Sequence, residues 1–242
     1  MKALILAAGL GKRLGDNTKD IPKSLVEVNG KPILQYQLEA IKENGVSDII
    51  IVIGHNGHRI KEYLANNLQF SKLNFTFVEN RIPDKSNSAY SLWLAKDQIK
   101  DTPYLHFNCD IILSSSLLKK LIDSVYPDVI VIDKKVQLKN NMEQVIMEGD
   151  KIVKMQNTLL DGAVGKGIGV AKLSPKNVQW LIQKIDEYLE KGDKNQNYYG
   201  IIRQAVNYLD FYGLDSGYEL LFEINTEDDL KNVSAKIKSQ FS

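Results

Sequence analysis

Short runs of aliphatic and β-branched residues alternate along this chain with amphipathic segments, and this alternation limits the possible folds more than any other feature. The runs occupy residues 3–6, 48–54, 74–80, 103–110 and 128–133. Between the first two, apolar residues recur at helical spacing, at Leu34, Leu38 and Ile41. Parallel strands need a helical crossover between them, so the pattern predicts an α/β, Rossmann-like, mostly parallel sheet with helices on both faces.

The pattern changes after residue 140. Residues 142–156 are typical of a hairpin that turns at Gly149 and Asp150, and residues 165–173 form a glycine-rich strand. A proline then opens a helix that runs to about residue 190, and a further helix is expected over 198–209. A strand over 218–225 precedes the capping sequence TEDD of a final helix. We therefore expect a small α+β lobe in the second half.

Composition excludes several classes of protein. The 31 basic and 30 acidic residues give a net charge of +1, without the basic stripe of a nucleic-acid-binding protein. No run approaches the roughly 18 apolar residues of a membrane span, and the apolar N-terminal run is too short for a signal peptide. The single cysteine, Cys109, excludes an internal disulfide and fits a reducing compartment. We expect a cytoplasmic protein that binds neither nucleic acid nor membrane.

A glycine-rich, cationic segment, LAAGLGKRLGDNTKDIPKS, follows the first strand at residues 6–24. It is not a dinucleotide fingerprint, because its third glycine, Gly15, falls one residue late. It is not a P-loop either, because Leu6 stands where the first glycine of that motif belongs. Gly9 and Gly11 still allow backbone N–H groups to approach phosphate oxygens closely.

The string LAAGLGKRL…IPKSLVEVNGKPIL resembles the signature of the nucleotidyltransferases that join a nucleoside triphosphate to a phosphorylated acceptor, as the sugar-phosphate nucleotidyltransferases do. The resemblance covers nearly the whole chain and is strongest over residues 3–40. It implies one domain over 1–242, divided roughly into a nucleotide-binding part (1–135), an acceptor lobe (136–215) and a C-terminal strand and helix (216–242).

The resemblance also assigns roles to residues of the glycine-rich segment. Arg13 is expected to fork onto β- and γ-phosphate oxygens, and Lys23 to place a point charge near the α-phosphate, where charge shifts in the transition state. Lys12 replaces a serine or threonine common in relatives, and we interpret it as a solvated loop charge. The residues expected to contact the nucleotide are Leu6, Ala7, Ala8, Gly9, Gly11, Asn87 and Ser88.

A magnesium site is expected at the carboxyl end of the strand over 103–110, where open α/β sheets bind ligands. Asp110 matches the family aspartate that binds Mg²⁺, although without the resemblance it reads equally well as a loop carboxylate or helix cap. The family's second ligand comes from a segment of the form E-x-D-[ST]-x-x-D, which here reads FEINTEDDL. Glu223 matches and Asn225 replaces the aspartate, so both stay candidates, because an amide carbonyl can also bind Mg²⁺.

The segment DKSNSAYSLWLAKD resembles an element of the short cytidylyltransferases, N-N-x-Y-S-L, with Asn87 matching and Ser88 replacing the second asparagine. Those enzymes activate phosphocholine, 2-aminoethylphosphonate, inositol phosphate or phosphoglutamine. The resemblance implies CTP as donor and a small phospho- or phosphono-acceptor, for the decoration of surface polysaccharide or lipid. Two alternatives stay open: a hexose-1-phosphate nucleotidyltransferase using UTP, dTTP or GTP, and a nucleotide-binding regulatory protein without catalysis. A homodimer is left open.

Departures from the sugar-phosphate pattern concern the acceptor. Lys166 stands where a glutamate usually accepts sugar hydroxyls, and a lysine cannot accept a hydrogen bond. Glu143 and the pair Tyr198–Tyr199 are expected to face a cationic or polar end of the acceptor. These residues predict a small zwitterionic or carboxylate-bearing acceptor. The alternatives are a solvated Lys166 and a tyrosine pair that only packs.

The three histidines, His55, His58 and His106, share no spacing that suggests a metal site. We expect structural or surface roles for them. Cys109 lacks an identifiable histidine partner and is not expected to act as a nucleophile.

Overall fold

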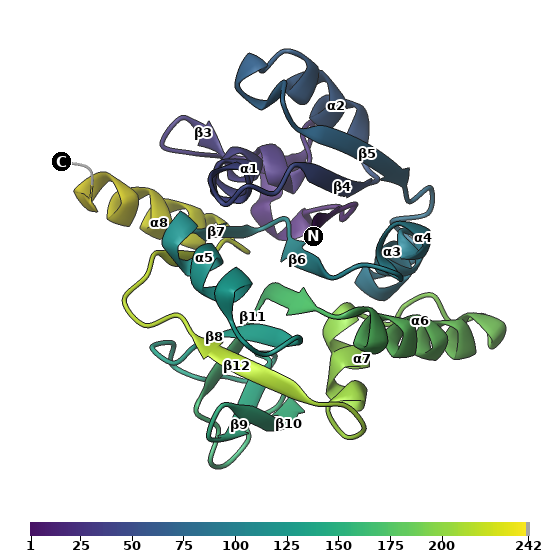
Figure 1. Cartoon of the computed structure of the whole chain (residues 1–242). Coiled ribbons are helices and arrows are strands. Elements are labelled where there is room, and N and C mark those ends of the chain that lie inside the picture. The colour runs from purple at the N-terminus through teal and green to yellow at the C-terminus, as the bar shows by residue number, and fades with distance from the viewer. Residues whose placement is uncertain (241–242) are drawn as a thin grey trace.

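The computed structural model describes residues 1–240 and centres on a nine-stranded sheet (Figure 1). In chain order its strands are β1 (Lys2–Ala7), β4 (Asp48–Ile53), β5 (Asn74–Glu79), β6 (Tyr104–Asn108), β8 (Val129–Asp133), β9 (Gln144–Glu148), β10 (Lys151–Gln156), β11 (Gly165–Leu173) and β12 (Phe211–Asp215). Their order across the sheet is β5-β4-β1-β6-β11-β8-β12-β10-β9.

Most strands of this sheet run in one direction. β5, β4, β1 and β6 pair in parallel, as do β8 and β12, whereas β11 is antiparallel to β6 and β8, and β10 to β12 and β9. Only β11 and β10 are reversed within the described sheet, so the prediction of a mostly parallel α/β sheet is confirmed. The reversed β11 joins the parallel half to the remaining strands.

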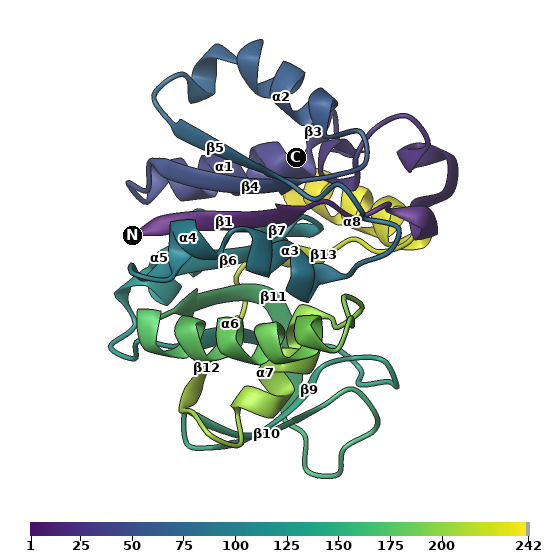
Figure 2. The same ribbon diagram turned by 90° about the vertical axis from the view of Figure 1, so that its right-hand side faces the viewer.

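Helices cover both faces of the sheet (Figure 2). One face carries α1 (Ile33–Glu43), α2 (Gly57–Ala65) and α5 (Ser115–Asp123), and the other carries α3 (Ser88–Leu94), α4 (Lys96–Ile99), α6 (Pro175–Glu190) and α7 (Tyr198–Ala205). Successive residues of β1 serve the two cores in turn: Ala3 and Ile5 pack on the first face, Leu4 and Leu6 on the second. Strands buried on both faces explain the continuous apolar runs of the sequence.

A third core ties the two ends of the chain together. β13 (Leu221–Glu223) pairs with β7 (Ile111–Leu113), and α8 (Glu227–Gln240) packs against the short 3₁₀ helix Lys12–Thr18 and the hairpin β2 (Glu27–Val28) and β3 (Lys31–Pro32). Figure 1 shows the yellow C-terminal helix beside the purple N-terminal segment. The C-terminal segment is thereby placed next to the glycine-rich loop.

The predicted capping box opens α8. Asp229 N–H donates to Thr226 Oγ1 at 3.2 Å, and Thr226 N–H donates back to Asp229 Oδ2 at 2.8 Å. The same carboxylate oxygen accepts from Asn225 N–H at 2.9 Å. The cap therefore fixes the backbone at Asn225 as well as the start of the helix.

Several element boundaries differ from expectation. The helix expected over residues 88–99 divides at Ala95 into α3 and α4, and the strand expected over 218–225 shortens to β13. β12 was not predicted at all, since its five residues include a glycine and show no clear alternation. Gly213 packs closely on the neighbouring strand, since a Cβ atom there would come within 2.6 Å of Met147 Cε and would displace that side chain. Among the described residues, no helix is both long and apolar enough to cross a membrane.

Candidate active site

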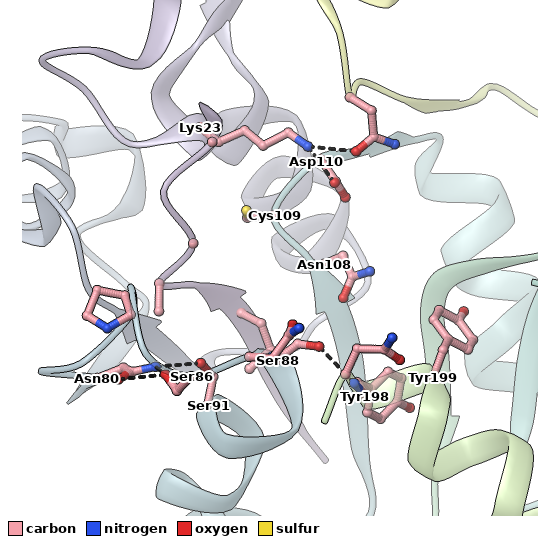
Figure 3. Close-up of a pocket in the computed structure, with 18 of the residues that line it drawn as sticks. Lys23, Asn80, Ser86, Ser88, Ser91, Asn108, Cys109, Asp110, Tyr198 and Tyr199 are labelled. Carbon is pink, nitrogen blue, oxygen red and sulfur yellow. Dashed lines mark hydrogen bonds and ion pairs between the residues drawn. The ribbon is translucent and has the colours of Figure 1, made fainter. Parts of the chain in front are cut away.

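A cavity of about 440 Å³ opens at the carboxyl ends of β1 and β6, the edge at which open α/β sheets bind ligands (Figure 3). Residues from the glycine-rich loop, from the segment after β5, from the end of β6 and from the start of α7 line it. The predicted site residues among them are Leu6, Ala8, Gly9, Gly11, Arg13, Lys23, Asn87, Ser88, Asp110, Glu143, Tyr198, Tyr199 and Asn225. Ala7, Lys166 and Glu223 do not line it.

Backbone conformation shapes the glycine-rich loop. Gly11 has φ +65°, which favours glycine, and its carbonyl accepts from Leu14 N–H at 2.9 Å and from Thr18 Oγ1 at 3.0 Å. At the neighbouring end of β4, Gly54 packs directly on the loop, since a Cβ there would lie 2.6 Å from the Ala8 carbonyl oxygen. The positive φ of Gly11 and the close approach of Gly54 to the Ala8 backbone set the course of the loop that lines the cavity.

Cationic side chains converge on two oxygen-bearing side chains in the cavity. Lys23 Nζ lies 2.6 Å from Asp110 Oδ2 and donates to Asn225 Oδ1 at 3.0 Å. Arg13 Nη2 donates to the same amide oxygen at 2.7 Å. Residues from three distant parts of the sequence therefore meet at one point, as Figure 3 shows for Lys23 and Asp110.

The second carboxylate oxygen of Asp110 lacks a partner. Asp110 Oδ1 is buried and forms no hydrogen bond with the described residues. A buried, unpaired carboxylate oxygen is costly unless a cation or donor reaches it. With the amide oxygen of Asn225 nearby, the donor set consists of hard oxygen atoms, which suits Mg²⁺. Residues 1–240 contain no cluster of three or more histidine, cysteine or acidic side chains that could hold a metal, so a metal here would need phosphate or water ligands as well.

Two ion pairs flank the cavity on the side of β9 and β11. Lys166 and Glu223 pair with each other, with side chains 16% and 22% exposed, so Lys166 does not project freely into solvent. Glu143 lines the cavity and accepts from Arg203 Nη1 through both carboxylate oxygens, at 2.6 and 2.7 Å. Each of these two acidic side chains therefore has a basic partner.

Asn87 and Ser88 begin α3 and connect it to α7. The Asn87 side chain accepts from Ser88 N–H at 2.8 Å, and Ser88 Oγ accepts from Tyr198 N–H at 2.8 Å. The Tyr199 hydroxyl donates to the Ile168 carbonyl, and the Tyr198 hydroxyl is buried. The two tyrosines therefore offer ring surface to the cavity more than free hydroxyl groups.

A model of the MobA-like NTP transferase domain matches residues 3–161, more than half of the chain. The chain belongs to this family. Choline-phosphate cytidylyltransferase of Streptococcus pneumoniae is 28% identical over 99% of this chain and 100% of its own. A solved structure of CTP:phosphocholine cytidylyltransferase from the same species shares the fold, with a TM-score of 0.80 at 23% identity over 98% of both chains.

Other relatives of this NTP transferase match over shorter stretches. CTP:phosphoglutamine cytidylyltransferase of Campylobacter jejuni is 34% identical over 55% of this chain and 53% of its own. Glucose-1-phosphate cytidylyltransferase of Salmonella typhimurium is 47% identical over 34% of this chain and 32% of its own. The predicted resemblance to nucleotidyltransferases, and to the short cytidylyltransferases in particular, is confirmed.

Several residues that line the cavity of the NTP transferase were not predicted. Asn80 is 2% exposed, and its Nδ2 donates to Ser86 and Ser91, both at 3.0 Å. Its position directly after β5, at the same edge of the sheet as Asp110, is the signal that could have found it. Arg203 gave no such signal, since its contact with Glu143 joins residues 60 positions apart in sequence.

Burial sets the charge state of two ionisable groups near the cavity. It raises the pKa of the Cys109 thiol to about 12, so the thiol stays protonated and is a poor nucleophile. It lowers the pKa of His106 from 6.5 to about 4, with a hydrogen bond to Asn108 opposing part of the shift. His106 is therefore neutral at pH 7, as expected for a structural histidine.

The lowered pKa of His106 predicts a pH-dependent stability. As the pH falls from about 6.5 to about 4, the unfolded chain binds a proton at this imidazole that the folded protein does not, so the free energy of unfolding should fall by up to about 3 kcal/mol. Urea unfolding at a series of pH values should show that the free energy of unfolding falls less steeply with decreasing pH in His106→Gln than in the natural protein. His58→Gln, at an exposed position, is the control and should leave the slope unchanged; equal slopes in all three would contradict a buried neutral imidazole.

Proposed function

We propose that this chain is a cytidylyltransferase that transfers CMP from CTP to a small phosphorylated or phosphonate acceptor and releases pyrophosphate. The observation that carries the proposal is the convergence of Arg13, Lys23, Asp110 and Asn225 beneath the glycine-rich loop. Full-length similarity to a choline-phosphate cytidylyltransferase supports CTP as the donor and a small acceptor.

The proposed reaction is a direct displacement. An oxygen of the acceptor's phosphate or phosphonate attacks the α-phosphorus of CTP, and the bond to the pyrophosphate oxygen breaks in line with the attack. Cys109 lines the cavity, but its raised pKa keeps the thiol protonated, so it offers no nucleophile and the proposed reaction has no covalent enzyme intermediate. Catalysis then consists of positioning and of charge stabilisation, by Lys23 near the α-phosphate and Arg13 on the leaving phosphates.

We propose that Asp110 and Asn225 hold Mg²⁺ in the working enzyme. Asp110 offers a buried oxygen without a partner, and Asn225 lines the cavity, whereas Glu223 is paired with Lys166 outside it. When bound, Mg²⁺ would neutralise phosphate charge at the reacting centre. Lys23 contacts both Asp110 and Asn225, and Arg13 contacts Asn225, so these two cations would transfer from those side chains to the phosphates of CTP.

The nucleotide would lie along the β1 side of the cavity. We assign it to the loop residues Leu6, Ala8, Gly9 and Gly11, whose backbone can reach phosphate oxygens and a pyrimidine edge, and not to Ala7, which does not line the cavity. Asn87 and Ser88 stand at the other wall, at the start of α3, where they can bind base or ribose.

The acceptor would lie between Asp110 and the start of α7. Glu143 and the rings of Tyr198 and Tyr199 line this end, and Lys166 pairs with Glu223 behind it. Because each charged side chain already has an opposite partner, a zwitterionic acceptor can exchange one ion pair for another without adding net charge. This balance supports a zwitterionic or carboxylate-bearing acceptor within the proposed function.

A second candidate is a hexose-1-phosphate nucleotidyltransferase. It is favoured by the match to a glucose-1-phosphate cytidylyltransferase, which has the higher identity over a shorter stretch. Paired Lys166 argues against it, since a polyhydroxy acceptor would find no free hydrogen-bond acceptor at that position.

The proposed function is tested by pyrophosphate release from CTP, UTP, dTTP and GTP. Each is offered with phosphocholine, 2-aminoethylphosphonate, phosphoglutamine or glucose-1-phosphate. We expect kcat/KM for CTP to exceed that for each other triphosphate by at least about tenfold, with one of the three small acceptors preferred over glucose-1-phosphate. Preference for glucose-1-phosphate would support the second candidate, and nucleotide binding without turnover would indicate a regulatory protein.

Lys23→Ala should lower kcat by roughly 10²-fold or more, the cost of losing one partner of the transition-state charge. Lys19→Ala is the matched control, since Lys19 lies in the same glycine-rich segment, is exposed and is not among the residues that line the cavity; its kcat should stay within about fivefold. Thermal melting of both variants checks that they are folded. A folded Lys23→Ala enzyme with near-normal turnover would exclude the assigned role.

Asp110→Asn should abolish the dependence of CTP binding on Mg²⁺, because one carboxylate supplies most of the site's negative charge. Isothermal titration of CTP with and without Mg²⁺ measures this without turnover. Glu223→Gln should keep the Mg²⁺ dependence, and Asn225→Ala should weaken it. A silent Asn225→Ala together with a defective Glu223→Gln would reverse the assignment of the second ligand.

A further inference from the structure

Asn108 lies where the two halves of the cavity meet. It is the last residue of β6 and stands between β1, where Leu6 pairs with it, and β11 of the lobe. Figure 3 places its side chain between Asp110 and the tyrosine pair. Asn108 also lines the cavity.

The amide of Asn108 is oriented by a buried histidine. His106 Nε2 lies 3.3 Å from Asn108 Oδ1, and an amide oxygen can only accept, so Nε2 carries the proton and donates. His106 Nδ1 is buried without a partner, which also favours protonation at Nε2 over protonation at Nδ1. The ring is itself held by stacking on Tyr198, with ring centroids 4.0 Å apart and planes 9° from parallel.

The opposite end of the amide faces the lobe. A Cβ atom at Gly169 of β11 would overlap Nδ2, Cγ and Cβ of Asn108, so the glycine makes room for this side chain, and Nδ2 is its nearest atom. We find no hydrogen bond from Nδ2 to any residue of the described chain. A donor that is fixed in direction, unpaired and next to a cavity is suited to bind an oxygen of a ligand.

Resting on the proposed cytidylyltransferase function, we propose that Asn108 is a specificity-determining residue for the acceptor, with His106 as its positioning residue. Nδ2 donates to a phosphate or phosphonate oxygen of the acceptor, close to Asp110, while the His106 bond to Oδ1 fixes the amide. The acceptor is assigned because Nδ2 points toward β11. A neutral donor here binds an anionic group that a carboxylate would repel.

The test separates the KM of the acceptor from the KM of CTP, using the best acceptor found in the panel above. Asn108→Ala should raise the acceptor KM by roughly tenfold or more, the scale of one hydrogen bond to a charged group, with the KM of CTP within about twofold. Asn108→Asp should raise the acceptor KM further, because it places a negative charge beside an anionic group. Melting temperatures confirm that each variant is folded.

Variants at the two neighbours test the positioning role. His106→Leu removes the N–H donor and should raise the acceptor KM. His106→Gln places an amide N–H close to the former Nε2, so its acceptor KM should stay close to that of the natural protein. Gly169→Ala pushes on Nδ2 and should give the same selective rise as His106→Leu. His58→Gln, an exposed histidine, is the control and should change neither KM.

The outcomes distinguish this inference from the proposed function. Turnover in the natural protein combined with an unchanged acceptor KM in Asn108→Ala, or with an equal rise in the KM of CTP, overturns the assignment of Asn108. His106→Gln no better than His106→Leu overturns the positioning role. If no acceptor of the panel is turned over by the natural protein, the proposed function itself fails, and this inference falls with it.

Discussion

The parallel pairing of β1 between β4 and β6 is the constraint on which the rest of the structure depends. It brings the carboxyl ends of three strands to one edge, so that the glycine-rich loop after β1, Gly54 after β4 and Asp110 after β6 become neighbours. A shift of one residue in either pairing would turn the side chains of β1 to the opposite cores and separate the loop from Asp110. The cavity is therefore a product of strand register as much as of the residues that line it.

The charged side chains of the cavity contact partners that the phosphates of a substrate could replace. Lys23 is 9% exposed, and a buried ammonium needs a partner, which Asp110 and Asn225 provide. In the proposed function, phosphates take over Lys23 and Arg13 and leave the oxygen atoms of Asp110 and Asn225 to a metal. The same arrangement is repeated on the lobe side, where two ion pairs balance Glu143 and Glu223. A charged group of the substrate could therefore replace one partner in such a pair.

Much of the fold follows from local patterns, and the rest depends on contacts that the sequence does not display. Apolar runs and caps predicted the strands of the parallel half, and the capping box of α8 formed as expected. β12 was missed because its five residues include a glycine and show no clear alternation, so that its place in the sheet depends on pairing with β8 and β10. In the site, the motif residues were found because phosphate chemistry restricts their type. Arg203 was not assigned a role, because only the folded topology brings it beside Glu143. His106 was expected to be structural or surface-exposed, and Asn108, which lies two residues further along the same face of β6, was not singled out. The sequence left Glu223 and Asn225 as equal candidates, and only the folded structure shows that Glu223, at the end of β13, pairs with Lys166 while Asn225 lines the cavity.

The return of the C-terminal segment to the glycine-rich loop has a consequence for biosynthesis. Chains fold from the N-terminus as they leave the ribosome, so β1, the loop and β6 can form while residues 221–240 are still being made. Until β13 pairs with β7 and α8 covers Leu14, the nascent sheet lacks Asn225 and keeps the third core exposed. A growing chain therefore holds an incomplete cavity throughout most of its synthesis. Interrupted translation would yield fragments that carry the phosphate-binding loop without the residue that joins Arg13 to Lys23.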